Sequence, residues 1–370
     1  MCKELTLLGG QKVAIDGSFL KGDNGKGNIY TQKRLTTELD RLDKKISDYQ
    51  DAMDKEDAIE DKQGDEFPEK DDQLKDKIEQ LKQKQKEKQK WQKSLQDSGE
   101  KQLSLVDSDA RLLRKRGKTI AGYNVQIAVD ERNHLIVAEV VTQEGNDMHQ
   151  LYPMADKAQQ VLQSEELTVL ADSGYYEGNQ LKACEENGIT ALVAIPGRYS
   201  LPKQENRYTR DDFIYDQKRD RFSCPEGKVL KTTGRSYQKD NKWKKVYASK
   251  AKDCQHCSQS EDCLSGKSRT RKLERWVNED VIDRHKKRMK DNPGCMKKRA
   301  SMVEHPFGTL KTRLGNHHFL MRGLEKCQGE FSLMILSYNF RRVLNILSVK
   351  KIQEYCVQRQ QNKLKTSQYA

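Results

Sequence analysis

The chain has 370 residues, 34% of them apolar and 34% charged, and it carries a net charge of +13 with an isoelectric point near 9.1. This excess of Lys and Arg suits a polyanionic partner such as nucleic acid, although a basic protein without such a partner would have the same composition. The sequence has no apolar run of about 18 residues and no signal peptide. These absences argue against a membrane protein or a secreted one and favour a cytoplasmic protein whose cysteines are free or metal-bound.

The first 102 residues combine a strand with a long helical hairpin. In Lys12–Leu20, apolar residues alternate with polar or small ones, which predicts a strand that contains Asp16. Apolar residues then recur at steps of three and four over 35–53 and again over 74–95, with an acidic stretch between the two runs. We expect two coiled-coil helices packed antiparallel. The hairpin could be a solvated projection or could grip DNA or a second protomer, and its mixed charges argue against a pure phosphate grip.

The next segment has the pattern of a mixed α/β core. The continuous apolar run Leu167–Ala171 is expected for a central strand buried on both faces, and Asp172 follows at its C-terminal end. The other predicted elements are a β-hairpin over 123–129 and 135–141, helices over 150–163 and 177–187, and a strand over 190–195.

A polar and basic segment follows, and it contains four cysteines. Cys254 and Cys257 form a Cys-x-x-Cys pair, with Cys224 upstream and Cys263 nearby, so the four could bind a structural Zn²⁺ tetrahedrally, with His256 able to replace one ligand, or could remain free thiols. Aromatic residues among the basic ones could stack on DNA bases or could form a small β core. These aromatics are Tyr199, Tyr208, Tyr215, Phe222, Tyr237, Trp243 and Tyr247.

Helices are predicted for the C-terminal part, over 281–313 and over 325–349. Glu304 and Lys311 are seven residues apart, two helical turns, so both would project from one face of a helix. Arg299 lies five residues before Glu304 and would align with it only in a distorted helix, which Pro306 could cause.

Acidic residues are candidates for a metal site. Mg²⁺ prefers hard oxygen ligands and keeps several waters, so two or three carboxylates on rigid elements are sufficient. Asp16 and Asp172 could meet if their strands pair, because ligand sites form at the strand ends of such sheets. Asp107, Asp109 and Asp147 flank the predicted hairpin and are expected to cap loops or to support such a site.

Seven segments give the sequence a specific resemblance. It resembles insertion-sequence transposases whose DDE domain carries a long insertion between the second Asp and the Glu. In order, the segments are AIDGSFLKG, DSDARLLRKRG, GYNVQIAVD, TVLADSGYY, VEHPFGTLK, HHFLMRGLEK and LSYNFRRVLNIL.

The resemblance implies an α/β fold with an RNase H-like mixed sheet flanked by helices, a coiled-coil hairpin insertion and a second, Cys-containing insertion. It implies a catalytic, metal-binding triad of Asp16, Asp172 and Glu304, and DNA contacts by Arg299 and Lys311. Mg²⁺ or Mn²⁺ would be the cofactor, element ends and target DNA the substrates, and a homodimer the form expected in the DNA complex.

Two departures from the family keep other interpretations open. Few residues precede Asp16, and the Tyr that relatives carry ahead of the Arg is not evident, Met296 being the nearest comparable side chain. The chain could be a truncated or inactive remnant that only binds DNA, or a non-transposing nuclease.

The expected boundaries follow from the sequence patterns. The expected segments are 1–31 (first strand), 32–102 (coiled-coil hairpin), 103–196 (core with Asp172), 197–280 (Cys-containing insertion), 281–350 (C-terminal helices with Glu304) and 351–370 (tail).

Overall fold

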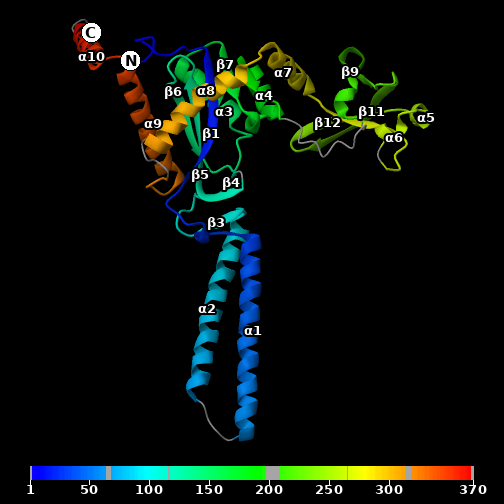
Figure 1. Cartoon of the computed structure of the whole chain (residues 1–370), viewed down its shortest axis with the longest axis vertical. Coiled ribbons are helices and arrows are strands. Elements are labelled where there is room, and N and C mark those ends of the chain that lie inside the picture. The colour runs from blue at the N-terminus through cyan, green and yellow to red at the C-terminus, as the bar shows by residue number, and fades with distance from the viewer. Residues whose placement is uncertain are drawn as a thin grey trace. The chain divides into compact units, whose positions relative to one another are not determined.

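A computed structural model describes residues 2–63, 68–115, 117–196, 208–264, 266–313 and 318–367. The chain divides into two compact units. Figure 1 shows the helices and strands along the chain. Unit 1 comprises Met1–Ile15 and Met148–Ser301, and unit 2 comprises Asp16–Asp147 and Met302–Ala370. Among the described residues no helix is both long enough and apolar enough to cross a membrane.

A six-stranded sheet has the order β4-β5-β1-β7-β8, with β6 paired to β5. The strands β1, β7 and β8 run parallel, whereas β4, β5 and β6 form an antiparallel meander, so the sheet is mixed as the sequence predicted. The strands are β1 (Lys12–Lys21), β4 (Arg111–Lys115), β5 (Lys118–Asp130), β6 (Ile136–Thr142), β7 (Leu167–Ala171) and β8 (Ile189–Val193).

In unit 1 the strand β7 pairs with both of its parallel neighbours. Ala14 lies opposite Leu170, and Leu170 lies opposite Leu192 in the next strand. Helix α7 (Glu279–Asp291) is fastened to this region because the buried His285 accepts a hydrogen bond from the backbone N–H of Val193 at 3.1 Å. The other helices of this part are α3 (Leu151–Leu162) and α4 (Gly178–Glu186).

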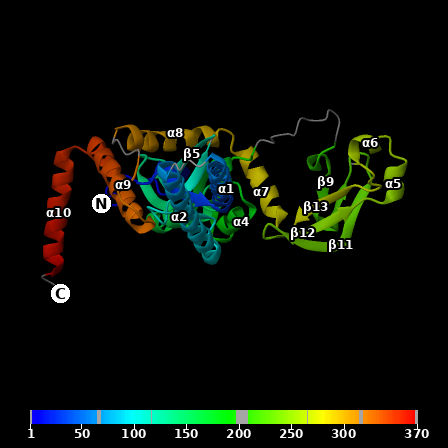
Figure 2. The same ribbon diagram turned by 90° about the horizontal axis from the view of Figure 1, so that it is seen from below.

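Unit 1 also contains a separate five-stranded antiparallel sheet of order β13-β12-β11-β10-β9 (Figure 2). Phe222 and Tyr247 lie in its buried core and Tyr208 and Tyr215 pack against that core, so these aromatics form a β core; Trp243 is 54% exposed. Tyr199 lies outside the described residues. The elements are β9 (Ile214–Asp216), β10 (Arg221–Ser223), β11 (Val229–Lys239), β12 (Lys242–Ala248), β13 (Lys272–Trp276), α5 (Ala251–Gln255) and α6 (Ser260–Cys263).

In unit 2 the helix α9 (Leu324–Ile346) packs on the β6 side of the sheet. Its Asn339 side chain accepts from the N–H of Ile136 at 2.9 Å and donates to the carbonyl of the same residue at 2.8 Å. The Gln328 side chain accepts from the N–H of Val141 at 2.8 Å. These bonds satisfy backbone groups on β6 that no further strand covers. Beyond α9 the chain continues as α10 (Val349–Ser367), so much of the expected tail is helical.

The helical hairpin consists of α1 (Gln32–Gln63) and α2 (Pro68–Ser98). Contacts of Lys88 with Glu38 at 2.5 Å and of Gln92 with Thr36 at 3.3 Å show that the helices run antiparallel, as predicted. A base of β2 (Ile29–Thr31) and β3 (Gln102–Ser104) joins them to the rest of unit 2.

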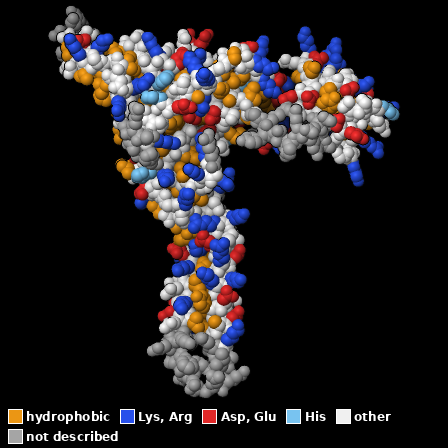
Figure 3. All heavy atoms as spheres, in the orientation of Figure 1, with side chains coloured by type: hydrophobic (Ala, Val, Ile, Leu, Met, Phe, Trp, Pro, Cys, Tyr) orange, Lys and Arg blue, Asp and Glu red, His pale blue; other side chains and the backbone are white. Residues whose placement is uncertain are grey.

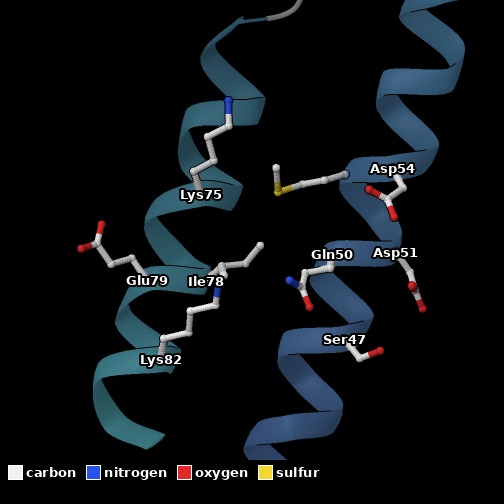
Figure 4. Close-up of a pocket in the computed structure, with 9 residues that line it drawn as sticks. Ser47, Gln50, Asp51, Asp54, Lys75, Ile78, Glu79 and Lys82 are labelled. Atoms are coloured by element: carbon white, nitrogen blue, oxygen red, sulfur yellow. The ribbon is translucent and has the colours of Figure 1, made fainter. Parts of the chain in front are cut away.

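Most of the hairpin surface is solvated. Lys, Arg, Asp and Glu alternate along the face seen in Figure 3, with apolar side chains confined to the seam. Further out, the helices are separated by a groove in which Ile78 and Met53 are surrounded by polar side chains such as Gln50 and Lys82 (Figure 4). The apolar packing is strongest at the base, where Leu35 and Leu95 are buried with Trp91 against them. The hairpin is therefore anchored at one end.

The predicted helical stretch over 281–313 is divided. Helix α7 ends at Asp291, and α8 (Cys295–Gly308) begins after a turn in which Gly294 has a φ of +83°. The intervening Pro293 disfavours helical geometry at the residue before it, which explains the break. Pro306 lies inside α8, and a π-helical turn, Thr309–Arg313, follows. This wider turn lies after Glu304, and the segment from Arg299 to Glu304 is α-helical, so the distortion expected between those two residues is not found.

Candidate functional site

Asp16 lies on β1, directly after three fully buried residues. Its half-buried carboxylate accepts a hydrogen bond from the N–H of Gly17 at 3.0 Å. Gly17 has no room for a side chain, because an added Cβ would lie 2.7 Å from a carboxylate oxygen of Asp147 and even nearer the amide of Gln126. The position beside Asp16 therefore requires glycine.

A buried polar network packs against Gly17. The Asp147 carboxylate accepts from the side-chain amides of Asn124 at 2.8 Å and Gln126 at 2.6 Å. Lys115 lies 3.9 Å from Asp147 and donates to the carbonyl of Gly17 at 3.4 Å. Buried polar groups that satisfy each other in this way hold the backbone in one position. No sequence pattern indicated the parts that Lys115 and Gln126 play, and for Asp147 the sequence favoured loop capping.

Lys311 reaches β1 from the π-helical turn and donates to the hydroxyl of Ser18. Burial lowers the pKa of Lys311, the charge of Lys115 lowers it further, and the carboxylate of Asp16 opposes both effects. Two lysines and two carboxylates, Asp16 and Asp147, thus interact on this part of unit 2, so their opposite charges balance. Each lysine ammonium attracts an anion such as phosphate.

Asp172 is held at the C-terminal end of β7. It caps a short 3-10 turn, Ser173–Tyr175, and accepts from the N–H of Gly174 at 2.8 Å. A guanidinium nitrogen of Arg299 lies 3.7 Å from the other carboxylate oxygen of Asp172 and 3.5 Å from the carbonyl oxygen of Ile15. The Asp172 side chain is 43% exposed and that of Arg299 is 13% exposed. Arg299 therefore joins Asp172 to the backbone of β1.

Glu304 is exposed on α8, between residues that fix the helix. Met302 and Val303 are buried on its N-terminal side, and the ring of His305 contacts the hydroxyl of Tyr338 at 3.1 Å. Tyr338 in turn donates to the carbonyl of His134 at 2.9 Å. The backbone at Glu304 is thus anchored within unit 2 while the carboxylate faces solvent.

The structure brings some of the predicted site residues together. It pairs Arg299 with Asp172 in unit 1 and couples Lys311 electrostatically to Asp16 in unit 2. Across the described ranges, no three His, Cys, Asp or Glu side chains are grouped so that they could hold a metal ion. The three carboxylates proposed as metal ligands therefore do not form such a group among the described residues.

Asp107 and Asp109 are capping residues, as expected, although they cap a distant helix. Asp107 accepts from the N–H of Gly323 at 3.0 Å and Asp109 from the N–H of Leu324 at 2.8 Å, at the start of α9. Asp107 also accepts from the hydroxyl of Tyr123 at 2.7 Å. Carboxylates at a helix N-terminus satisfy free N–H groups there and interact favourably with the helix dipole.

The protein is mixed α/β, with Asp172 beside Arg299 after β7 in unit 1 and Asp16 on β1 with Lys311 nearby in unit 2. A scan against protein-family models matches residues 11–340 to the transposase DDE domain, so the chain belongs to that family. No curated protein and no solved structure matches the chain. Family membership identifies this chain as a transposase, a kind of protein that binds DNA.

Proposed function

We propose that this chain is an active transposase, which cleaves DNA strands and transfers them with the aid of divalent metal ions held by Asp16, Asp172 and Glu304. The observation that carries the proposal is the family match over 11–340, which includes all three carboxylates. An RNase H-like core accounts for the strand order, in which an antiparallel hairpin adjoins β1 and two parallel strands follow. In this proposal 32–102 and 197–280 are insertions into that core.

The register of the parallel strands supports a shared role for two of the acids. Ala14 pairs with Leu170, Asp16 follows Ala14 by two residues, and Asp172 follows Leu170 by two. Side chains two residues apart along a strand project from the same face. We infer that Asp16 and Asp172 act together, with Glu304 supplied by α8.

The donor chemistry fits Mg²⁺ or Mn²⁺. Asp16 and Asp172 each accept a backbone hydrogen bond through one carboxylate oxygen, and an ionised carboxylate can accept several such bonds. These hard oxygen ligands are the kind that Mg²⁺ prefers. Divalent ions at such a site would activate the attacking oxygen and stabilise the leaving one.

The cationic side chains would position the DNA. Lys311 and Lys115 would neutralise a phosphate near Asp16, and Arg299 would hold the Asp172 carboxylate in place until substrate binds. Water would first break a phosphodiester bond at each element end, which leaves a 3′-hydroxyl. That hydroxyl would then attack a phosphodiester of the target, forming a new P–O bond as the target's own 3′-oxygen leaves. We expect two chains in the DNA complex, one for each end of the element.

A second candidate function is DNA binding without cleavage. It is favoured by the exposure of Glu304 and by the absence, within the described ranges, of three grouped metal-binding side chains. The two candidates differ in whether the acidic residues are needed for any activity.

Nicking of supercoiled DNA in Mg²⁺ or Mn²⁺ distinguishes the two candidates. We expect Asp172→Asn to reduce nicking by about a hundredfold or more, because it removes a charge that acts in the transition state. Glu165→Gln, at an exposed position in the same unit, is the matched control and should nick normally. Equal nicking by the two variants would reject this site, and DNA binding without nicking by the unmodified chain would favour the second candidate.

A further inference from the structure

Four cysteines from separate segments line one small cavity beside the five-stranded sheet. Cys224 lies in the turn between β10 and β11, Cys254 in α5, Cys257 just after α5, and Cys263 in α6. The cavity they line has about 30 Å³ of internal space, enough for a single ion or water molecule. Figure 2 shows the two short helices beside the strands of this sheet. All four residues belong to unit 1.

The turn that contains Cys224 directs a backbone N–H at the sulfur of that residue. The N–H of Cys224 donates to the carbonyl of Lys228 at 2.8 Å, and the N–H of Gly227 donates back to the carbonyl of Cys224 at 2.9 Å. Gly227 has a φ of +74°, in the region that favours glycine. As a result the N–H of Lys228 points at the Cys224 sulfur, 3.2 Å away. An amide directed at sulfur stabilises a thiolate, the form that binds metals.

The other three sulfurs are held by local turns. The N–H of Cys257 donates to the carbonyl of Cys254 at 3.4 Å, and the hydroxyl of Ser249 contacts the Cys254 sulfur at 3.0 Å. Cys263 packs against the buried core of the sheet, and its carbonyl accepts from Arg271 at 2.7 Å.

We propose that Cys224, Cys254, Cys257 and Cys263 bind one structural Zn²⁺. Thiolates are soft ligands, which select zinc over the magnesium expected at the acidic site. His256 is exposed and is not among the residues that line the cavity, so the sulfurs alone form the ligand set. In the described ranges no three such side chains are grouped closely enough to hold an ion. Binding therefore requires the sulfurs to rotate into the cavity, toward Zn–S distances of about 2.3 Å.

The proposed ion would fasten α5 and α6 to a sheet with a small core. Phe213, Phe222, Leu230, Tyr247 and Leu273 form that core, and two of the four cysteines pack directly on it. Zinc that binds only the folded form stabilises the fold by mass action. The site is independent of the acidic residues and does not rest on the proposed catalytic function.

The test measures metal bound by the full chain, purified without a metal-affinity tag. We expect about one zinc per chain by elemental analysis. Co²⁺ exchanged into the same protein should give thiolate-to-cobalt charge-transfer absorption and the visible bands of a tetrahedral ion, a readout of the ligands that does not involve DNA cleavage. Cys254→Ser and Cys257→Ser should each lose most of the zinc, whereas Cys295→Ser and Cys356→Ser should keep it.

Three results would overturn the proposal. The first is a full chain free of zinc that also shows no thiolate absorption with added Co²⁺. The second is zinc content unchanged in both cavity variants. The third is a mass that reveals a disulfide between two of the four cysteines, which are all free thiols in the structure. If a cavity variant fails to fold, the cobalt spectrum of the unsubstituted chain still decides the matter.

Discussion

At the scale of single residues, Gly17 is the most constrained position beside the acidic residues. In Gly17→Ala, the new methyl group would collide with Gln126 and Asp147, both buried in a network that cannot move freely. We expect the free energy of unfolding to fall by about 1–3 kcal/mol, as for other overpacked sites, and DNA nicking to fall with it because Asp16 is displaced.

Thermal unfolding and the nicking assay check this prediction. Gly145→Ala is the matched control, since an added Cβ there meets nothing within 4 Å. It should leave both measurements unchanged. If Gly17→Ala unfolds and nicks like the control, the close packing behind Asp16 is not part of the working site.

Some site residues could be predicted from the sequence and others could not. Asp16 lies in a strand that the alternation of apolar residues predicts, and Asp172 follows a strand that a continuous apolar run predicts. The contacts of Gly17 with Gln126 and Asp147 join residues more than a hundred positions apart. Such contacts depend on which strands become neighbours in the sheet, and no local sequence pattern predicts which strands pair. Glu304 depended on the family resemblance, because a Glu on a helix is by itself an ordinary surface residue.

At the scale of elements, the docking of α7 on β8 depends on a neutral histidine. His285 has no exposed surface, and its Nε2 accepts from Val193, so that nitrogen must carry no proton. The pKa of His285 is lowered from 6.5 to about 4, mainly by burial and also by the charge of Arg288, while Glu185 partly opposes the shift. Between pH 6.5 and about 4, His285 is therefore protonated in the unfolded chain but not in the folded chain.

The free energy of unfolding should accordingly fall as the pH drops from 6.5 to about 4, and it should level off below that range. A shift from 6.5 to about 4 corresponds to a loss of roughly 3 kcal/mol. His285→Gln keeps an acceptor for Val193 but does not titrate, so its unfolding midpoint should depend less steeply on pH. His256→Gln, at an exposed histidine, is the control and should retain the full dependence. Identical pH profiles for the two variants would contradict the role given to His285.

Elements with strong periodicity were predicted well, and the exceptions have physical causes. The strand Leu167–Ala171 was predicted with the boundaries found, because a run buried on both faces is apolar throughout. The division of 281–313 was missed although Pro293 marks it, since the charged residues on either side are good helix formers. The short strand Arg111–Lys115 was also missed, because two adjacent leucines flanked by charged residues do not give the alternating pattern of a strand.

At the scale of the whole molecule, the charge is distributed unevenly among the parts. The helical hairpin mixes both signs along the face seen in Figure 3, which suits a solvated projection. The net charge of +13 therefore matters for DNA binding at the places where cations gather, as Lys115 and Lys311 do near Asp16. Such cations bind DNA by releasing counterions from its phosphates.

This mechanism predicts that DNA binding and DNA cleavage respond differently to two changes. If the chain neutralises about six to ten phosphates, affinity should fall by about 10³ to 10⁵ between 50 and 200 mM salt. Asp172→Asn should keep that salt dependence while it loses nicking. In the proposed function Asp172 holds a metal ion for cleavage, whereas the cations bind the DNA phosphates. Affinity measured by fluorescence anisotropy over a salt series, with both proteins on the same DNA, checks this. A variant that lost binding and nicking together would show that Asp172 supports the fold or the DNA contact, and affinity indifferent to salt would exclude phosphate contacts as the main source of binding.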